Sequence, residues 1–251
     1  MTKKAGVSFY SGIIYGPLLF VLSIWVVYWV EIRFGLRFTS FGIYPQKIEG
    51  LRGILLSPFI HGGLQHLFNN SVPLFVLSAA LFYFYRNVKW KLLLTGLLLT
   101  GLLTWIIGRP SYHIGASGIV YLLASFLFFR GIFSKQYQLT ALSLTVVFLY
   151  GSLLWYVFPI DATISWEGHL SGFLVGFVFS FFFKENTIPT KKYEWQREDY
   201  NPEEDEFLKH FDEHGNFIES IPDTDSIEEE KTNASRIVYH FKKIKKEKPS
   251  D

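Results

Sequence analysis

Cysteine is absent from the 251-residue sequence, which excludes disulfide frameworks, thiolate metal sites and cysteine nucleophiles. A phosphate-binding glycine loop and an internal repeat are also absent. Charged residues make up only 18% of the chain, whereas 49% of residues are hydrophobic and 19% are aromatic. The formal net charge of +2 points to no particular partner. Because a soluble domain rarely buries so much apolar surface, we expect a membrane protein.

The apolar residues fall into six runs of about 17 to 25 residues, the length of helix that crosses a hydrocarbon core about 30 Å thick. The first run is too long for a signal-peptide core and has no small-residue cleavage site, so it is expected to remain attached. We therefore expect an all-α polytopic membrane protein with six transmembrane helices, at residues 7–30, 59–85, 92–107, 115–129, 139–158 and 164–183 or 168–183.

Basic residues indicate how these helices are oriented. They occur at the N-terminus and after the second, fourth and sixth runs, whereas the loops after the third and fifth runs contain only Arg109. The long first loop, residues 31–58, carries four basic residues and is an exception. Because cytoplasmic loops are enriched in Lys and Arg, both termini are expected in the cytoplasm.

Residues 184–251 differ in character from residues 1–183 and predict a separate, charged cytoplasmic tail. Acidic runs at 203–206 and 228–230 are followed by a basic end. Such runs cannot bury enough apolar area to fold alone, so we expect a largely disordered or loosely helical segment. A sharper alternative is that residues 236–248 rest on the anionic inner leaflet.

Polar residues interrupt three of the six runs, each time near the start of the run. They are His61, His66 and Asn70 in the second run, Ser117 in the fourth and His169 in the sixth. With the N-terminus inside, these three helices all run inward from the outer face, so their first turns lie at similar depth. Ionisable residues within spans usually face the bundle interior and mark function, and we therefore expect one site.

Helical spacing supports the convergence of these residues. His66 and Asn70 are four residues apart and share one helical face, as do Ser117 and Tyr121. Beside His169 runs a stripe of small residues that would let a neighbouring helix approach closely; it consists of Gly168, Gly172 and Gly176.

Ser117 and His169 form the combination that nucleophilic acyl transfer requires. A serine hydroxyl is a weak nucleophile until a base accepts its proton, and neutral histidine is suited to that task near neutral pH. The developing oxyanion needs donors, for which the backbone N–H of Ser117 and the side chains of His66 and Asn70 are candidates. Glu167 points to a different helical face from His169, so a dyad is expected rather than a triad.

Three motifs, in family order, resemble those of the rhomboid family of intramembrane serine proteases over about residues 58–180. They are His61-Gly-Gly-Leu-Gln-His66-Leu-Phe-Asn-Asn70, Gly115-Ala-Ser117-Gly118 with Tyr121, and His169-Leu-Ser-Gly172-Phe-Leu-Val-Gly176. The resemblance implies that Ser117 attacks the scissile carbonyl and that His169 is general base and then acid. It also implies that His66 and Asn70 line the oxyanion hole and that Tyr121 packs on the His169 ring. Supporting roles would fall to His61, Gly115 and Gly118.

The same resemblance implies a six-span protease of the bacterial inner membrane, whose partners are transmembrane protein substrates and the lipid bilayer. It implies a half-submerged helical structure for the first loop, and no metal, other cofactor or nucleic acid. One alternative is a non-catalytic rhomboid-like scaffold that binds transmembrane partners, although such relatives lack the serine and histidine kept here. Another is a metalloprotease or metal transporter built on His61, His66 and His169, but the sequence has no His-Glu-x-x-His motif.

Overall fold

The chain forms two units, Met1–Lys191 and Lys192–Asp251. This computed structural model describes residues 12–134, 136–161, 163–183, 193–205, 207–212 and 214–218. The predicted interfacial segment 236–248 lies outside the described residues, and the predicted domain boundary after residue 183 stays a prediction.

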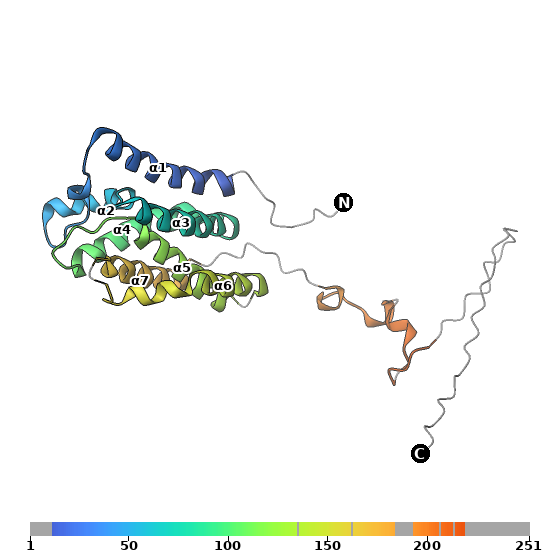
Figure 1. The fold of residues 1–251 in the computed structure, drawn as a ribbon. Helices are drawn as coiled ribbons and strands as arrows, with labels where there is room; N and C mark the ends of the chain where they lie inside the picture. Colours follow the sequence, from blue (N-terminus) through green and yellow to red (C-terminus); the bar gives the residue numbers. More distant parts are fainter. Residues whose placement is uncertain are drawn as a thin grey trace, which may run out of the picture. The chain divides into compact units, whose positions relative to one another are not determined.

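The first unit is a bundle of helices (Figure 1). In chain order the helices are α1 (Gly12–Phe34), α2 (Gly53–Leu56), α3 (Leu64–Phe84), α4 (Lys89–Ile107), α5 (Ser117–Phe133), α6 (Tyr137–Tyr150) and α7 (Trp166–Phe182). Within the described residues the only β pairing consists of two isolated bridges, Ile43 with His113 and Phe211 with Phe217. The predicted all-α class and polytopic helical bundle are therefore confirmed.

Helix length and apolarity explain which elements suit a membrane. In the described part of the chain α1, α3 and α4 are each long and apolar enough to cross one, and α5 and α6 are shorter apolar helices. At its end α6 continues as a 3-10 helix, η4 (Gly151–Val157). At the rise of each helix type, α6 and η4 together extend about 35 Å, enough for a hydrocarbon core about 30 Å thick.

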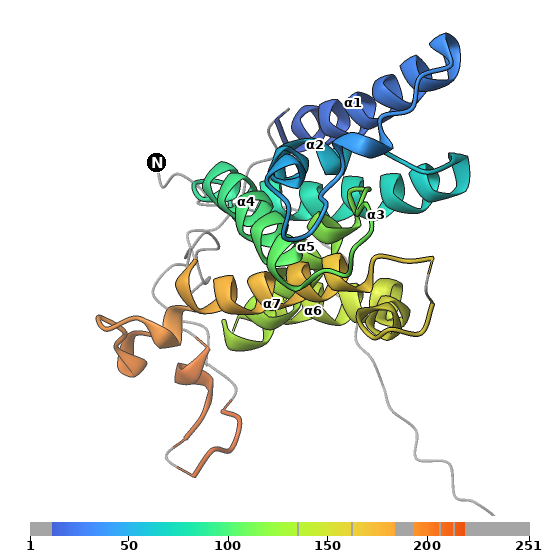
Figure 2. The same cartoon turned by 90° about the vertical axis from the view of Figure 1, so that its left-hand side faces the viewer.

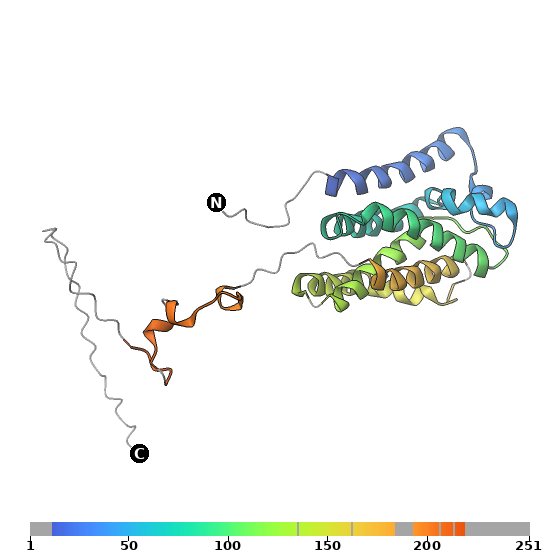
Figure 3. The ribbon, with the colours of Figure 1, turned by 180° about the vertical axis from the view of Figure 1, so that it is seen from behind.

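Helix α5 lies at the centre of the bundle. It contacts α3, α4, α6 and α7, and the core between these helices includes Leu67, Leu74, Leu122 and Phe126. Helix α1 packs on α3 at one edge of the bundle, as Figures 2 and 3 also show. The element that begins with Ser117 is therefore held from all sides by its neighbours.

Several helices differ in their bounds from the sequence prediction; α1 ends at Phe34 rather than at residue 30, α5 at Phe133 rather than 129, and α6 at Tyr150 rather than 158. Helix α3 begins at Leu64 rather than at residue 59, because Pro58 and two glycines precede it, and His61 consequently lies before the helix. The first loop is a series of short helical turns, η1 (Thr39–Phe41), η2 (Ile48–Arg52), α2 and η3 (Ser57–Phe59).

The second unit is described only in part. It contains three 3-10 turns, η5 (Glu194–Gln196), η6 (Pro202–Glu204) and η7 (Leu208–His210), together with the bridge between Phe211 and Phe217.

Candidate active site

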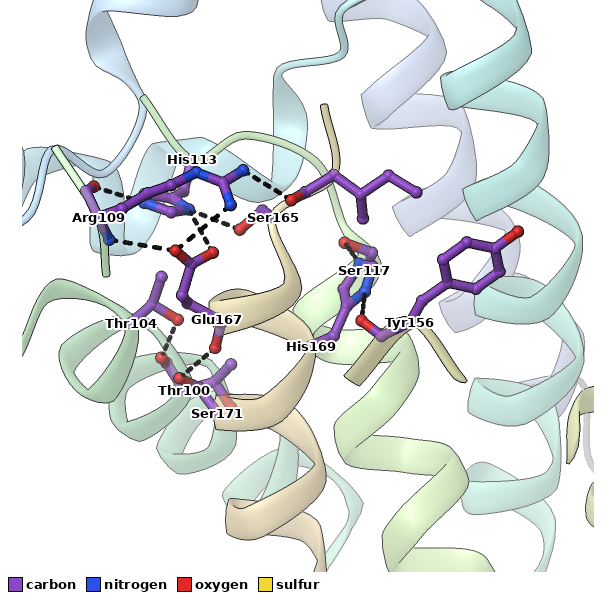
Figure 4. A network of polar contacts seen from close by, with 11 residues as sticks. Thr100, Thr104, Arg109, His113, Ser117, Tyr156, Ser165, Glu167, His169 and Ser171 are labelled. Atoms are coloured by element: carbon purple, nitrogen blue, oxygen red, sulfur yellow. Dashed lines mark hydrogen bonds and ion pairs between the residues drawn. The ribbon is translucent and has the colours of Figure 1, made fainter. Parts of the chain in front are cut away.

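Ser117 and His169 meet between α5 and α7 (Figure 4). Ser117 is the first residue of α5, and its Oγ lies 2.9 Å from Nε2 of His169, which is on the first turn of α7. His169 is buried. The N–H groups of Ile119 and Val120 donate to the carbonyl oxygen of Ala116, the N-cap residue of α5, at 3.0 and 3.1 Å. The positive end of the helix dipole lies at Ser117.

The other ring nitrogen of His169 has a backbone partner. Its Nδ1 lies 2.9 Å from the carbonyl oxygen of Tyr156, in η4. Because a carbonyl can only accept, Nδ1 carries the proton, and Nε2 presents its lone pair to the hydroxyl of Ser117. The ring of Tyr121 stacks on the His169 ring, with centroids 4.2 Å apart and planes 11° apart. The imidazole is thus fixed in both tautomer and orientation.

The glycine stripe of α7 explains how this helix comes so close to α5. A Cβ atom at Gly172 would lie 2.1 Å from the carbonyl oxygen of Gly118, and one at Gly176 would lie 2.3 Å from that of Leu122. Gly168 differs from the other two, because a Cβ there would first meet Oγ of Ser165, the residue that directly precedes α7.

Gly115 places the start of α5 beside α3. Its φ of +104° lies in the region that favours glycine, and its N–H donates to the carbonyl oxygen of Ser57 at 2.9 Å. A Cβ atom at this position would lie 2.6 Å from Nε2 of His66 and 3.5 Å from Nδ2 of Asn70. The two predicted oxyanion-hole side chains therefore lie next to the residue two before Ser117.

Hydrogen bonds orient these side chains. His66 Nδ1 accepts the N–H of Gly62 at 3.4 Å, which leaves Nε2 as the N–H of the neutral ring. Asn70 Nδ2 donates to the carbonyl oxygen of His66 at 3.1 Å, so its second N–H remains available. The His61 ring meets the His66 ring edge-on, with centroids 5.1 Å apart.

A cavity of about 780 Å³ brings most of the predicted site residues together. Its walls include Ser117, His169, His66, Asn70 and Tyr121. A smaller cavity, of about 40 Å³, is also lined by Ser117, together with Gly115, Gly118 and Gly168 among others. His61 lines neither cavity and is buried behind His66.

A polar cluster around Glu167 was not predicted from the sequence. The Glu167 side chain is only 1% exposed, and its Oε1 lies 3.6 Å from Nη1 of Arg109 and accepts the Arg109 backbone N–H at 3.2 Å. His113 Nδ1 lies 2.6 Å from Oγ of Ser165, and its Nε2 lies 3.1 Å from the carbonyl oxygen of Arg109. The cluster joins the loop before Ser117 to the start of α7 (Figure 4).

Burial lowers the pKa of His113, although its hydrogen bond to Arg109 and the charge of Glu167 act in the opposite direction. The sequence held one signal for the cluster. Arg109 is the only basic residue of two loops, and Glu167 is an acidic residue at the start of the sixth apolar run.

No group of three or more His, Asp or Glu side chains in the described residues is arranged to hold a metal ion.

Comparison with known proteins identifies the family. The Rhomboid domain family model matches residues 49–186, more than half of the chain. An uncharacterized protein of Mycobacterium tuberculosis, Rv1337, is 33% identical over 177 residues, which cover 64% of this chain and 71% of the relative. An uncharacterized protein of Mycobacterium leprae, ML1171, is 31% identical over 153 residues, which cover 55% of this chain and 58% of the relative. The chain therefore belongs to the rhomboid family of intramembrane proteases and is an integral membrane protein.

Proposed function

We propose that this protein is an intramembrane serine endopeptidase that hydrolyses peptide bonds in or near the transmembrane segments of membrane proteins. The observation that carries the proposal is the 2.9 Å contact between Ser117 Oγ and His169 Nε2, with Nδ1 of the same ring held by the Tyr156 carbonyl. A nucleophile, a base and a group that orients the base are the parts that acyl transfer by serine requires.

The reaction proceeds in two halves. Ser117 Oγ attacks the scissile carbonyl carbon while its proton passes to His169 Nε2. The C–N bond then breaks as His169 gives this proton to the leaving amine, and an ester remains on Ser117. Water, deprotonated by His169, attacks the ester, and the returning proton restores the Ser117 hydroxyl.

Three donors stabilise the negative oxygen of the tetrahedral intermediate. They are the backbone N–H of Ser117 at the N-terminus of α5, the Nε2–H of His66 and the free N–H of Asn70. All three residues line the same cavity as His169, which supports this assignment.

The substrate is a transmembrane segment with small or helix-breaking residues near its outer end, where it can unwind into the cavity. Positive-inside counting favours both termini in the cytoplasm, and we assign the protein to a bacterial inner membrane. Residues 1–183 form the protease domain, and the charged segment 184–251 is dispensable for cleavage. The reaction needs no metal or other cofactor.

Cleavage of a model transmembrane segment by the purified protein tests the proposal. Ser117→Ala should abolish cleavage, which should persist in the presence of a chelator. A matched control is Ser143→Ala, because Ser143 is buried on α6 and its hydroxyl donates to the Thr140 carbonyl oxygen of the same helix at 2.8 Å. Cleavage that persists in Ser117→Ala would refute the assignment, and an unmodified protein that binds such segments without cleaving them would instead be a scaffold.

A further inference from the structure

Helix α3 carries two stripes of different chemistry in its first turns. Leu64, Phe68 and Val72 are four residues apart, exposed and apolar. One position further along, Gln65, Asn69 and Pro73 form a second stripe, and all three line the 780 Å³ cavity that contains Ser117 and His169. The position of Gln65 and Asn69 near the end of the helix does not explain why they are polar, because the neighbouring stripe at the same depth is apolar. What distinguishes their stripe is that it lines the cavity.

The Gln65 and Asn69 side chains are exposed and bonded to each other. Nε2 of Gln65 donates to Oδ1 of Asn69 at 2.9 Å. One such bond between two amides uses the N–H of one and the oxygen of the other, whichever way the amides are turned. A carbonyl oxygen and an NH₂ group are left over, directed at no other described residue.

Pro73 extends this stripe with a backbone feature. Proline has no N–H, so the carbonyl of Asn69 lacks the donor that an ordinary residue four positions later would provide. Amides and a weakened helix turn are costly against hydrocarbon, where every polar group needs a partner. The stripe suits a ligand with its own donors and acceptors.

An unwound substrate segment is such a ligand. Its scissile carbonyl can reach Ser117 only if the surrounding residues leave the helical conformation, which strips their N–H and C=O groups of partners. In an extended chain one residue presents its N–H and C=O on the same edge. The remaining carbonyl oxygen of the Gln65–Asn69 pair can accept from the N–H of such a residue, and the remaining NH₂ can donate to its C=O.

We propose that the Gln65–Asn69 pair binds the backbone of the unwound substrate segment. The inference rests on the proposed protease function. Because the contact is with the backbone, it is independent of the side chains that flank the scissile bond.

Cleavage kinetics of a model transmembrane substrate test the proposal in the full-length protein. Gln65→Met and Asn69→Leu remove one amide each, and each should lower kcat/KM about threefold, with about a tenfold loss for the double variant. Labelling of Ser117 by a small serine-directed probe, which has no extended backbone, should remain unchanged. Thr145→Val is the matched control, because Thr145 is exposed on α6 and lies outside the cavity.

A second arm changes the substrate. Replacing one backbone amide beside the scissile bond with an ester removes an N–H, which should slow the unmodified enzyme but not slow the double variant further. Unchanged kcat/KM in the double variant would overturn the proposal, and so would a parallel loss of probe labelling, which would place the defect in the catalytic pair. Failure of the protease function itself would be distinct, since the unmodified protein would then not cleave the substrate at all.

Discussion

Gly172→Ala should separate the two catalytic residues by forcing α7 away from α5. A Cβ atom at position 172 would lie 2.1 Å from the Gly118 carbonyl oxygen, whereas ordinary contact begins at 3.4 Å. The helices must therefore move apart by about 1.3 Å, because a backbone oxygen in the middle of a packed bundle cannot rotate away. Overpacking of this kind costs about 1–3 kcal/mol of stability.

The effect on catalysis follows from the position of His169, three residues before Gly172 on the same helix. The 2.9 Å contact between Ser117 Oγ and His169 Nε2 would lengthen to about 4 Å, beyond hydrogen-bonding distance. A misplacement of about 1 Å costs about 100-fold in rate. We therefore expect Gly172→Ala to lower the cleavage rate about 100-fold.

The assay is cleavage of a model transmembrane substrate, with thermal unfolding measured on the same samples. Gly151→Ala is the control, because a Cβ there would lie 3.6 Å from its nearest neighbour and φ is −61°. Gly151→Ala should behave as the unmodified protein. A Gly172→Ala variant that cleaves at the unmodified rate would refute the reasoning that helix approach sets the Ser117–His169 distance.

Three further predictions concern single side chains. Asn70→Ala should lower the cleavage rate about 100-fold or more by removing an oxyanion donor, and an unchanged rate would exclude that role. Tyr121→Ala should lower the rate about tenfold through lost stacking on His169, and an unchanged rate would exclude that role. The pKa of His113 is lowered in the folded state, so as the pH falls His113 binds a proton in the unfolded chain before it does so in the folded protein. The free energy of unfolding therefore decreases as the pH drops below about 6.5. Thermal unfolding at pH 7.5 and 5.5 should thus differ more in the unmodified protein than in His113→Gln, and an equal difference in both would contradict this.

Run length and composition suffice to predict the all-α class, because a helix that faces lipid is apolar on all sides. The ends of the helices are harder to predict. Apolar residues continue from α6 into η4, so the hydrophobic pattern does not indicate that the α-helix changes to a 3-10 helix at Gly151. The start of α3 depends on Pro58 and on the glycines before Leu64, and a prediction from apolar runs takes no account of these residues.

The approach of Ser117 to His169 is predictable from the sequence for two reasons. Both residues start helices that cross the membrane in the same direction, and the glycines beside His169 let another helix come close. The partner of His169 Nδ1 is not predictable, since it is the backbone carbonyl of Tyr156 and every residue has one. Glu167 is correctly separated from His169 by helical-face reasoning, but its contacts with Arg109 depend on how two loops pack across helices.

The most direct test of the central claim is covalent labelling of Ser117 by a mechanism-based serine-protease probe in detergent, with the site identified by mass spectrometry. We expect the unmodified protein to be labelled at Ser117 and not at Ser165, although Ser165 Oγ also lies near a histidine nitrogen, Nδ1 of His113, at 2.6 Å. The reason is that the proposed oxyanion donors His66 and Asn70 adjoin the start of α5, where Ser117 lies. His169→Ala should abolish labelling while the protein remains folded. Equal labelling of the unmodified protein and His169→Ala, or labelling at another serine, would contradict the proposed Ser117–His169 mechanism.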